Sequence, residues 1–134
     1  MKAQVKWVGE QVFLGTSESG HSMVLDANNG ELAPSPMESV LVSLGSCSSV
    51  DVVSILKKTK QDITGCIVEL SGTRANGVPA LFTDIHLNFI ISGQDIASKH
   101  VTRAVNLSAE KYCSIALMLN AKVNITHSFN IIAE

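Results

Sequence analysis

Residues 33–60 read APSPMESVLVSLGSCSSVDVVSILKKTK, and this stretch decides the fold. It begins with the signature of a helix N-terminus: Ser35 is a good N-cap residue, Pro36 suits the first helical position, and Glu38 lies three residues after the cap. An N-cap serine and a following glutamate form a capping box, in which each side chain bonds the other residue's backbone N–H. The pattern therefore predicts a helix over roughly residues 36–60.

The predicted helix is almost free of charge along its length. Between Val40 and Leu56 the only formal charge is Asp51. A helix that is small or apolar on nearly every face is buried on nearly every face. Cys47 lies at its middle, so the stretch predicts a central buried helix that carries a thiol.

Length and composition favour one domain over residues 1–134, because 46% hydrophobic residues are enough for a packed core. The net charge of −2 and the pI near 6.1 argue against a nucleic-acid partner. The basic group Lys57, Lys58 and Lys60 lies at the expected helix C-terminus, where the helix dipole favours cations.

The three cysteines do not form a disulfide scaffold, and the first ten residues lack an apolar signal core. No run approaches the length that a membrane span requires, so no membrane partner is expected. These observations together predict a cytoplasmic protein with reduced thiols.

Alternating apolar residues bounded by turn residues predict six strands, and helical spacing predicts three helices. The strands are expected over residues 3–9, 12–15, 21–26, 63–71, 81–92 and 122–132. The helices are expected over residues 36–60, 96–112 and 115–120. On the closing strand, one face carries Val123, Ile125, His127, Phe129 and Ile131. The order βββ-α-ββ-αα-β predicts an α+β fold with antiparallel sheets around the central helix.

A helix of this length, about 37 Å, is hard to cover with one small sheet and two short helices. The simplest further cover is a second copy of the chain. We therefore expect a homodimer with the central helices near the two-fold axis.

Cys47 and Cys113 are the candidate redox residues, because small and polar neighbours leave room around both thiols. Cys113 lies at an expected helix N-terminus beside Lys111, and both features lower a thiol pKa. Asp51, one helical turn after Cys47, would raise the pKa of that thiol. The alternative is that both are inert core cysteines, since free cysteine is among the most buried residue types. Cys66 lies on the apolar face of a strand and is expected to be core.

No metal or cofactor is expected. No two of the histidines His21, His86, His100 and His127 pair with each other or with a cysteine at metal-ligand spacing, and no phosphate loop, nucleophile elbow or HExxH motif is present. Glu38 is expected to be a cap, the alternative being a carboxylate that holds a cation near the thiol.

Several of these stretches resemble the OsmC/Ohr superfamily over essentially the whole chain. They are the helix start Ala33–Glu38, the segment Cys47–Val53 and the segment Ala109–Cys113. The segments Val5–Val8, Leu107–Cys113 and Val123–His127 resemble the YhfA-like branch in particular.

The resemblance implies an OsmC-like domain over residues 1–134 and an intertwined homodimer with active sites at the subunit interface. It also implies a thiol-dependent peroxidase for organic hydroperoxides, with Cys47 as the attacking thiolate and Cys113 as the resolving thiol. A lipoyl-type dithiol would then reduce the disulfide.

The chain departs from the peroxidase pattern at two positions. Peroxidase members use an Arg from the N-terminal strands, which is held by a Glu ten residues before the first Cys. Here residues 1–73 contain no Arg. The residue ten positions before Cys47 is Met37, and Glu38 lies nine positions before it. The substitute cations that remain open are Lys6, His21, Lys111, and Arg74 or Arg103 from a partner chain. The missing Arg motivates an alternative function: a non-catalytic or weakly active redox-sensing or small-molecule-binding OsmC-like dimer.

Overall fold

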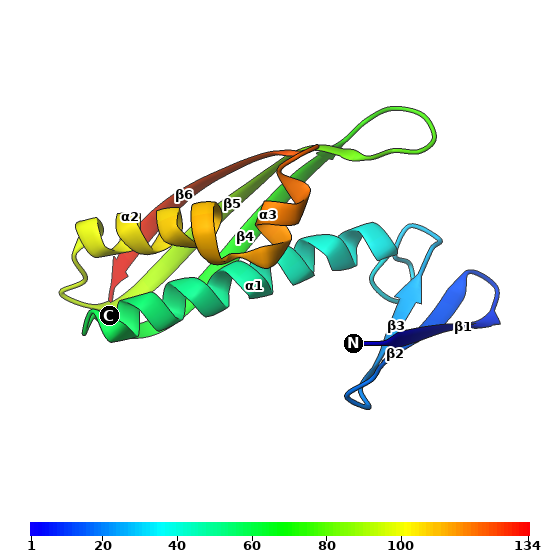
Figure 1. Ribbon diagram of the computed structural model, residues 1–134, viewed down its shortest axis with the longest axis horizontal. Helices are drawn as coiled ribbons and strands as arrows, with labels where there is room; N and C mark the ends of the chain where they lie inside the picture. The colour runs from blue at the N-terminus through cyan, green and yellow to red at the C-terminus, as the bar shows by residue number, and fades with distance from the viewer. The chain divides into compact units, whose positions relative to one another are not determined.

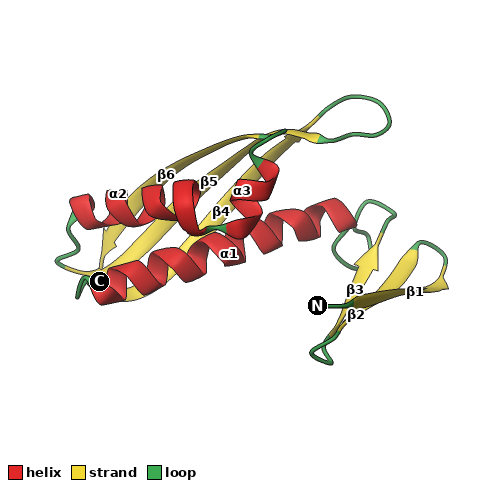
Figure 2. Ribbon diagram, viewed as in Figure 1, coloured by secondary structure: helices red, strands yellow, loops and turns green.

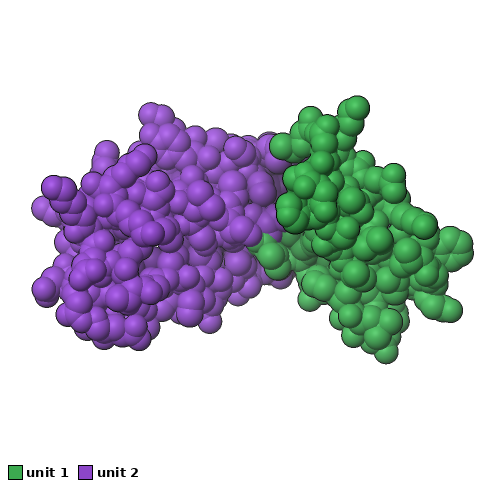
Figure 3. Space-filling model, turned by 90° about the horizontal axis from the view of Figure 1, so that it is seen from below, with its two compact units in different colours: residues 1–42 green, residues 43–134 purple.

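The computed structural model describes all 134 residues and has the predicted order of elements (Figures 1 and 2). The elements are β1 (Ala3–Gly9), β2 (Val12–Ser17), β3 (Ser22–Asp26), α1 (Pro36–Lys58), β4 (Asp62–Arg74), β5 (Phe82–Gln94), α2 (Ser98–Leu107), a π-helical turn (Ser108–Tyr112), α3 (Ser114–Leu119) and β6 (Asn124–Ala133). Figure 3 colours two compact units, residues 1–42 and 43–134. The division falls inside α1, and the single domain over residues 1–134 stays a prediction.

The N-terminal unit contains the expected antiparallel meander, with the strand order β1-β2-β3. Buried Asp26 ends β3 and fixes the loop that follows, because its carboxylate accepts hydrogen bonds from the backbone N–H groups of Asn28 and Leu32, both at 2.8 Å. This bonding pattern is typical of Asp in turns.

The start of α1 forms the predicted capping box. The Ser35 hydroxyl accepts from the Glu38 backbone N–H at 3.1 Å, and the Glu38 carboxylate accepts from the Ser35 N–H at 2.9 Å. Two of the N–H groups that a helix start leaves without intrahelical partners are satisfied in this way.

Within one chain, α1 is buried on one side only. Its buried residues are Leu44, Gly45, Ser48, Val52 and Leu56. On other faces the side chains of Val42 and Val50 are 63% and 68% exposed. The expected burial on nearly every face is therefore wrong for a single chain, because the second sheet and α2 cover only one stripe of the helix.

The expectation that no run is long enough to span a bilayer is also wrong. By length and composition alone, the 23-residue helix α1 could cross a membrane. The central helix of a folded domain meets the same criterion, and Asp51 is the one charge along most of its length.

The second unit contains a three-stranded sheet with the order β4-β5-β6. β4 and β5 form the predicted antiparallel hairpin, but β6 runs parallel to β5. The prediction of antiparallel sheets is thus wrong for this sheet: α2 and α3 carry the chain back along the sheet, so that β6 enters in the same direction as β5. The core face carries Ile85, Leu87, Phe89 and Ile91, all at most 3% exposed.

Gly45 lets α1 approach this sheet closely. A Cβ at this position would come within 2.7 Å of the Leu70 Cδ1 on β4. The glycine therefore makes room for a leucine of the sheet, which is a packing role in addition to any space it leaves beside Cys47.

The helix expected over residues 96–112 ends at Leu107 and continues as the π-helical turn. The Cys113 backbone N–H bonds the Ser108 carbonyl five residues earlier, at 2.8 Å. Cys113 itself is extended, with φ −75° and ψ 102°, and serves as the N-cap of α3. The wider turn and the extended residue together set the position of the Cys113 side chain.

Candidate thiol redox site

The structure brings the two predicted cysteines, Cys47 on α1 and Cys113 before α3, into contact. Cys113 is fully buried, and its thiol lies close enough to that of Cys47 for the two to interact. Its sulfur also accepts from the Ser48 hydroxyl and from the Ala116 backbone N–H, both at 3.4 Å. Residues 66 positions apart in sequence therefore form a thiol pair held by α1 and the start of α3.

Burial raises the pKa of the Cys113 thiol, and the neighbouring Cys47 thiol raises it further. The bonds from Ser48 and Ala116 lower this pKa but do not offset the burial. The prediction of a lowered pKa at Cys113 is therefore wrong in its net direction. The helix N-terminus acts as expected, through the Ala116 N–H, but loss of solvent is the larger effect.

Lys111 is exposed, and its ammonium group lies 5.5 Å from the centre of the Tyr112 ring. Arg74, another of the cations considered, donates from Nε to the Ala80 carbonyl at 2.8 Å in the β4–β5 hairpin loop. Arg103 lies on α2 and lines a pocket that also contains Asp51.

Asp51 connects this pocket with the surroundings of the thiols. Its carboxylate accepts from the Ser108 hydroxyl at 3.0 Å. Ser108 is 1% exposed, and its carbonyl holds the Cys113 N–H. Asp51 is thus linked through one serine to the backbone of Cys113.

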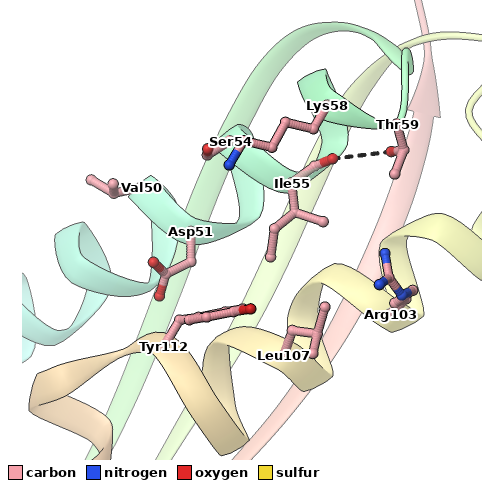
Figure 4. Close-up of a pocket in the computed structure, with 9 residues that line it drawn as sticks. All are labelled: Val50, Asp51, Ser54, Ile55, Lys58, Thr59, Arg103, Leu107 and Tyr112. Carbon is pink, nitrogen blue, oxygen red and sulfur yellow. Dashed lines mark hydrogen bonds between the residues drawn. The ribbon is translucent and has the colours of Figure 1, made fainter.

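The pocket lined by Asp51 and Arg103 lies between α1 and α2, and we call it the α1–α2 pocket (Figure 4). Its volume is about 330 Å³. Its lining residues are Val50, Asp51, Ser54, Ile55, Lys58, Thr59, Arg103, Leu107 and Tyr112. Figure 4 shows Asp51 and Tyr112 at one end and Arg103 and Thr59 at the other. The pocket combines apolar walls with carboxylate, hydroxyl and cationic groups.

Two predicted supporting residues, Glu38 and His21, belong to the N-terminal unit. Glu38 is a cap, as the sequence predicted, and His21 bonds the Ser19 hydroxyl through Nδ1 at 3.1 Å. Cys66 is partly buried on the core face of β4, and burial raises the pKa of its thiol.

The sequence did not indicate three further residues near the thiols: Ser48, Ser108 and His127. They share the wall of a cavity of about 10 Å³ with Ala116. The signal for His127 was present in the sequence, because an ionisable side chain shares the apolar face of the closing strand. For Ser48 there was none, since α1 is rich in serine throughout, and Ser108 continues the helical pattern after α2 without a distinguishing feature.

A comparison with protein families places this chain in a known one. It belongs to the OsmC-like proteins, whose family model matches residues 28–128. This confirms the resemblance to the OsmC/Ohr superfamily.

Among individual relatives, the chain is 55% identical to Protein YhfA of Escherichia coli K12 over 133 residues, 99% of each protein. This supports the YhfA-like branch. The structure also matches a hypothetical protein from Aquifex aeolicus VF5, with a TM-score of 0.89 and 32% identity over 99% of this chain and 96% of that one. An organic hydroperoxide resistance protein OsmC from Legionella pneumophila matches with a TM-score of 0.72 and 15% identity over 96% and 95%. At this identity, the match to the Legionella protein shows that the two proteins share a fold.

Proposed function

We propose that the protein is a two-cysteine thiol peroxidase that reduces organic hydroperoxides in the cytoplasm. The observation that carries the proposal is the contact between the Cys47 and Cys113 thiols. Membership of the OsmC-like family, in which the Legionella neighbour is named for organic hydroperoxide resistance, supports the choice of substrate.

The reaction would begin at Cys47. Its thiolate attacks the O–O bond of the hydroperoxide, which releases an alcohol after protonation and leaves a sulfenic acid on Cys47. The Cys113 sulfur then displaces hydroxide from the sulfenic acid, forming a disulfide and, with a proton, water. A dithiol of the lipoyl type returns both cysteines to thiols and is itself oxidised to a disulfide.

The thiol contact suits this second step, because a disulfide requires the two sulfurs to meet at about 2.05 Å. Thiols that already interact with each other need only a short movement to reach that distance. Two inert core cysteines would not need such proximity.

The test uses the Cys66→Ser protein, in which Cys47 and Cys113 are the only thiols. We expect one equivalent of cumene hydroperoxide to remove both free thiols, and dihydrolipoamide to restore them and support turnover. Cys47→Ser in the same background should abolish the reaction. Two thiols that stay free after peroxide, without turnover, would overturn the proposal.

A homodimer is part of the proposed assembly. Val42 and Val50 on α1 are exposed large apolar side chains, and a second copy of the chain would cover them. Scattered apolar residues are normal on protein surfaces, but these two lie on a helix with a single charge between Val40 and Leu56.

The α1–α2 pocket favours a second candidate function, the binding of a small molecule with an apolar body and an anionic group. Its volume lies at the lower end of the range for ligand sites, which is about 300–1,000 Å³. Lys58 and Arg103, from facing helices, supply positive charge, and Ile55 and Leu107 supply apolar wall.

This candidate can be tested with the fluorescent probe anilinonaphthalene sulfonate, which has this chemistry. We expect fluorescence enhancement that falls at least about fivefold in Arg103→Glu, because the substitution removes the attractive charge. Lys57→Glu, on the same helix as Lys58 but outside the pocket, serves as the charge-matched control. Equal fluorescence of both variants would exclude the pocket as the binding site.

A further inference from the structure

The side chain of Cys113 has no contact with solvent, since the residue is 0% exposed. If it acts as the resolving thiol, its S–H proton must leave the sulfur as the new S–S bond forms. The same step must deliver a proton to the hydroxide that leaves Cys47. A buried reaction of this kind needs protein groups that accept and return the proton.

Ser48 touches the reacting sulfur. Its hydroxyl lies 3.4 Å from the Cys113 Sγ and its side chain is itself almost fully buried. The Ser108 hydroxyl lies near the Ser48 carbonyl, at 3.5 Å, but its proton is used by the closer Asp51 carboxylate, at 3.0 Å. In the resting structure the Ser48 hydroxyl donates to the sulfur. A hydroxyl can also accept, so rotation about its C–O bond lets Ser48 take the S–H proton and pass its own proton on.

His127 lines the same small cavity as this serine. The cavity, whose wall includes Ser48, Ser108 and His127, is at the lower size limit for one water molecule. His127 belongs to the core face of β6, opposite Leu87 of β5, and it is only partly buried. Imidazole accepts and releases protons near neutral pH, and partial exposure lets His127 exchange protons with solvent.

The other ionisable groups around Cys113 are differently engaged. From α1 come Cys47, the reaction partner, and Asp51, which accepts from Ser108. The π-helical turn carries the exposed groups Glu110, Lys111 and Tyr112. The ionisable residues of α2 lie mostly on its exposed face; they are Lys99, His100 and Arg103. The facing residues of β5 are apolar, Leu87 and Phe89. His127 is thus the base that shares a cavity with Ser48.

We propose that Ser48 and His127 handle the proton of the resolving step, Ser48 at the sulfur and His127 as the acceptor that lines the same cavity. This rests on the proposed peroxidase function. The Cys113 S–H proton passes through Ser48 to His127, while the sulfur displaces hydroxide from the Cys47 sulfenic acid. His127 then returns one proton to the hydroxide. The sum is sulfenic acid plus thiol giving disulfide plus water, with no net proton change.

The experiment follows disulfide formation in rapid-quench samples of the Cys66→Ser protein, by alkylation of free thiols and mass spectrometry. Ser48→Ala and His127→Gln are compared with the matched control His86→Gln. His86 lies on the opposite face of the same sheet and bonds the hydroxyls of Thr126 and Ser128. Two oxidants are used, cumene hydroperoxide and diamide, because diamide also requires the second thiol to displace a group from the first.

We expect disulfide formation to slow about tenfold or more at pH 7 in both test variants, since general acid–base groups contribute at least this much. The control should stay within about twofold of the parent. The rate of the parent should show an inflection as the pH is varied, and this inflection should vanish in His127→Gln. A purely structural role would slow the reaction without removing the inflection.

A smaller slowing in His127→Gln, or a pH profile that keeps the inflection, overturns the proposal. Should His127→Gln not fold, His127→Asn provides the same readout. The two oxidants separate the hypotheses: if diamide gives the expected effects and the hydroperoxide leaves both thiols free, the peroxidase function fails while the proton assignment stands.

Discussion

Glu38 lies one residue from the position of the catalytic glutamate in the peroxidase pattern, and its contacts are those of a helix cap. Its carboxylate is used by the Ser35 N–H at the start of α1. Because glutamine serves equally well in a capping box, we predict that Glu38→Gln leaves both the free energy of unfolding and the peroxidase rate nearly unchanged. Ser35→Ala should lower the free energy of unfolding by about 1 kcal/mol. Urea denaturation and turnover with cumene hydroperoxide measure the two quantities. A stable Glu38→Gln protein without turnover would instead assign the carboxylate to the chemistry.

The thiols make stability depend on pH in the alkaline range. Burial raises the pKa of Cys66, and also that of Cys113, above the ordinary value of 9.0. The folded state therefore holds these protons more tightly than the unfolded state. The stabilisation is complete below pH 9.0 and is lost as the pH rises toward and through the raised values.

We predict that replacing Cys66 with valine makes this alkaline loss shallower, because one of the two contributing groups is removed. The measurement is the free energy of unfolding by urea at several pH values between 7 and about 10.5, under reducing conditions. Other groups, lysines among them, titrate equally in both proteins and cancel in the comparison. Parallel curves for the two proteins would show that Cys66 ionises alike in the folded and unfolded chains.

Among the elements, the β4–β5 hairpin depends on a glycine at its open end. A Cβ on Gly93 would meet the backbone of β4 at the Asp62 carbonyl and, at 2.9 Å, at the Ile63 Cα. Backbone atoms cannot move aside as a side-chain end can. We predict that Gly93→Ala lowers the free energy of unfolding by about 2 kcal/mol or more.

Gly65→Ala is the matched control for this prediction. It lies on the partner strand, where a Cβ would meet Ser92 at an ordinary contact distance of 3.6 Å. Thermal and urea unfolding of the two variants should differ clearly, with Gly65→Ala close to the parent. Similar losses in both would mean that the hairpin is sensitive to any added methyl group, rather than to the backbone contact at Gly93.

The elements were predictable where a local pattern determines them. The capping box fixed the start of α1, and alternation located the strands to within a few residues. The direction of β6 was not predictable, because alternation is the same for parallel and antiparallel pairing. The π-helical turn was also missed, since its residues Ser108–Tyr112 continue a helical pattern without a breaker.

The candidate site was predictable only in its two main residues. Cys47 and Cys113 were indicated by their neighbours and by the family resemblance, and the structure brings them together. The raised pKa of Cys113 could not be foreseen, because burial depends on packing against α1 and the sheet. Ser48 and His127 come together only through the placement of β6 beside β5.

At the scale of the whole molecule, the longest helix, α1, has exposed apolar side chains at Val42 and Val50. These side chains lead to a prediction about assembly. We expect the protein to be a dimer by analytical ultracentrifugation. Val50→Lys should raise the dissociation constant at least about tenfold, because a buried charge without a partner is costly. Asn130→Lys, on the exposed polar face of β6, adds the same charge as a control. A parent protein that sediments as a monomer at micromolar concentration would contradict this prediction.

The π-helical turn before Cys113 has a consequence for how such chains diverge. It closes with a bond from Cys113 to the fifth residue before it, one residue wider than an α-helical turn. Deleting one codon in Ser108–Tyr112 would restore α-helical spacing and turn the following residue by about 100° around the helix axis. A single insertion or deletion, with no change in any cysteine, is thus enough to gain or lose the thiol pair. The width of this turn, as well as the presence of both cysteines, should therefore mark the members of the branch in which the two sulfurs meet.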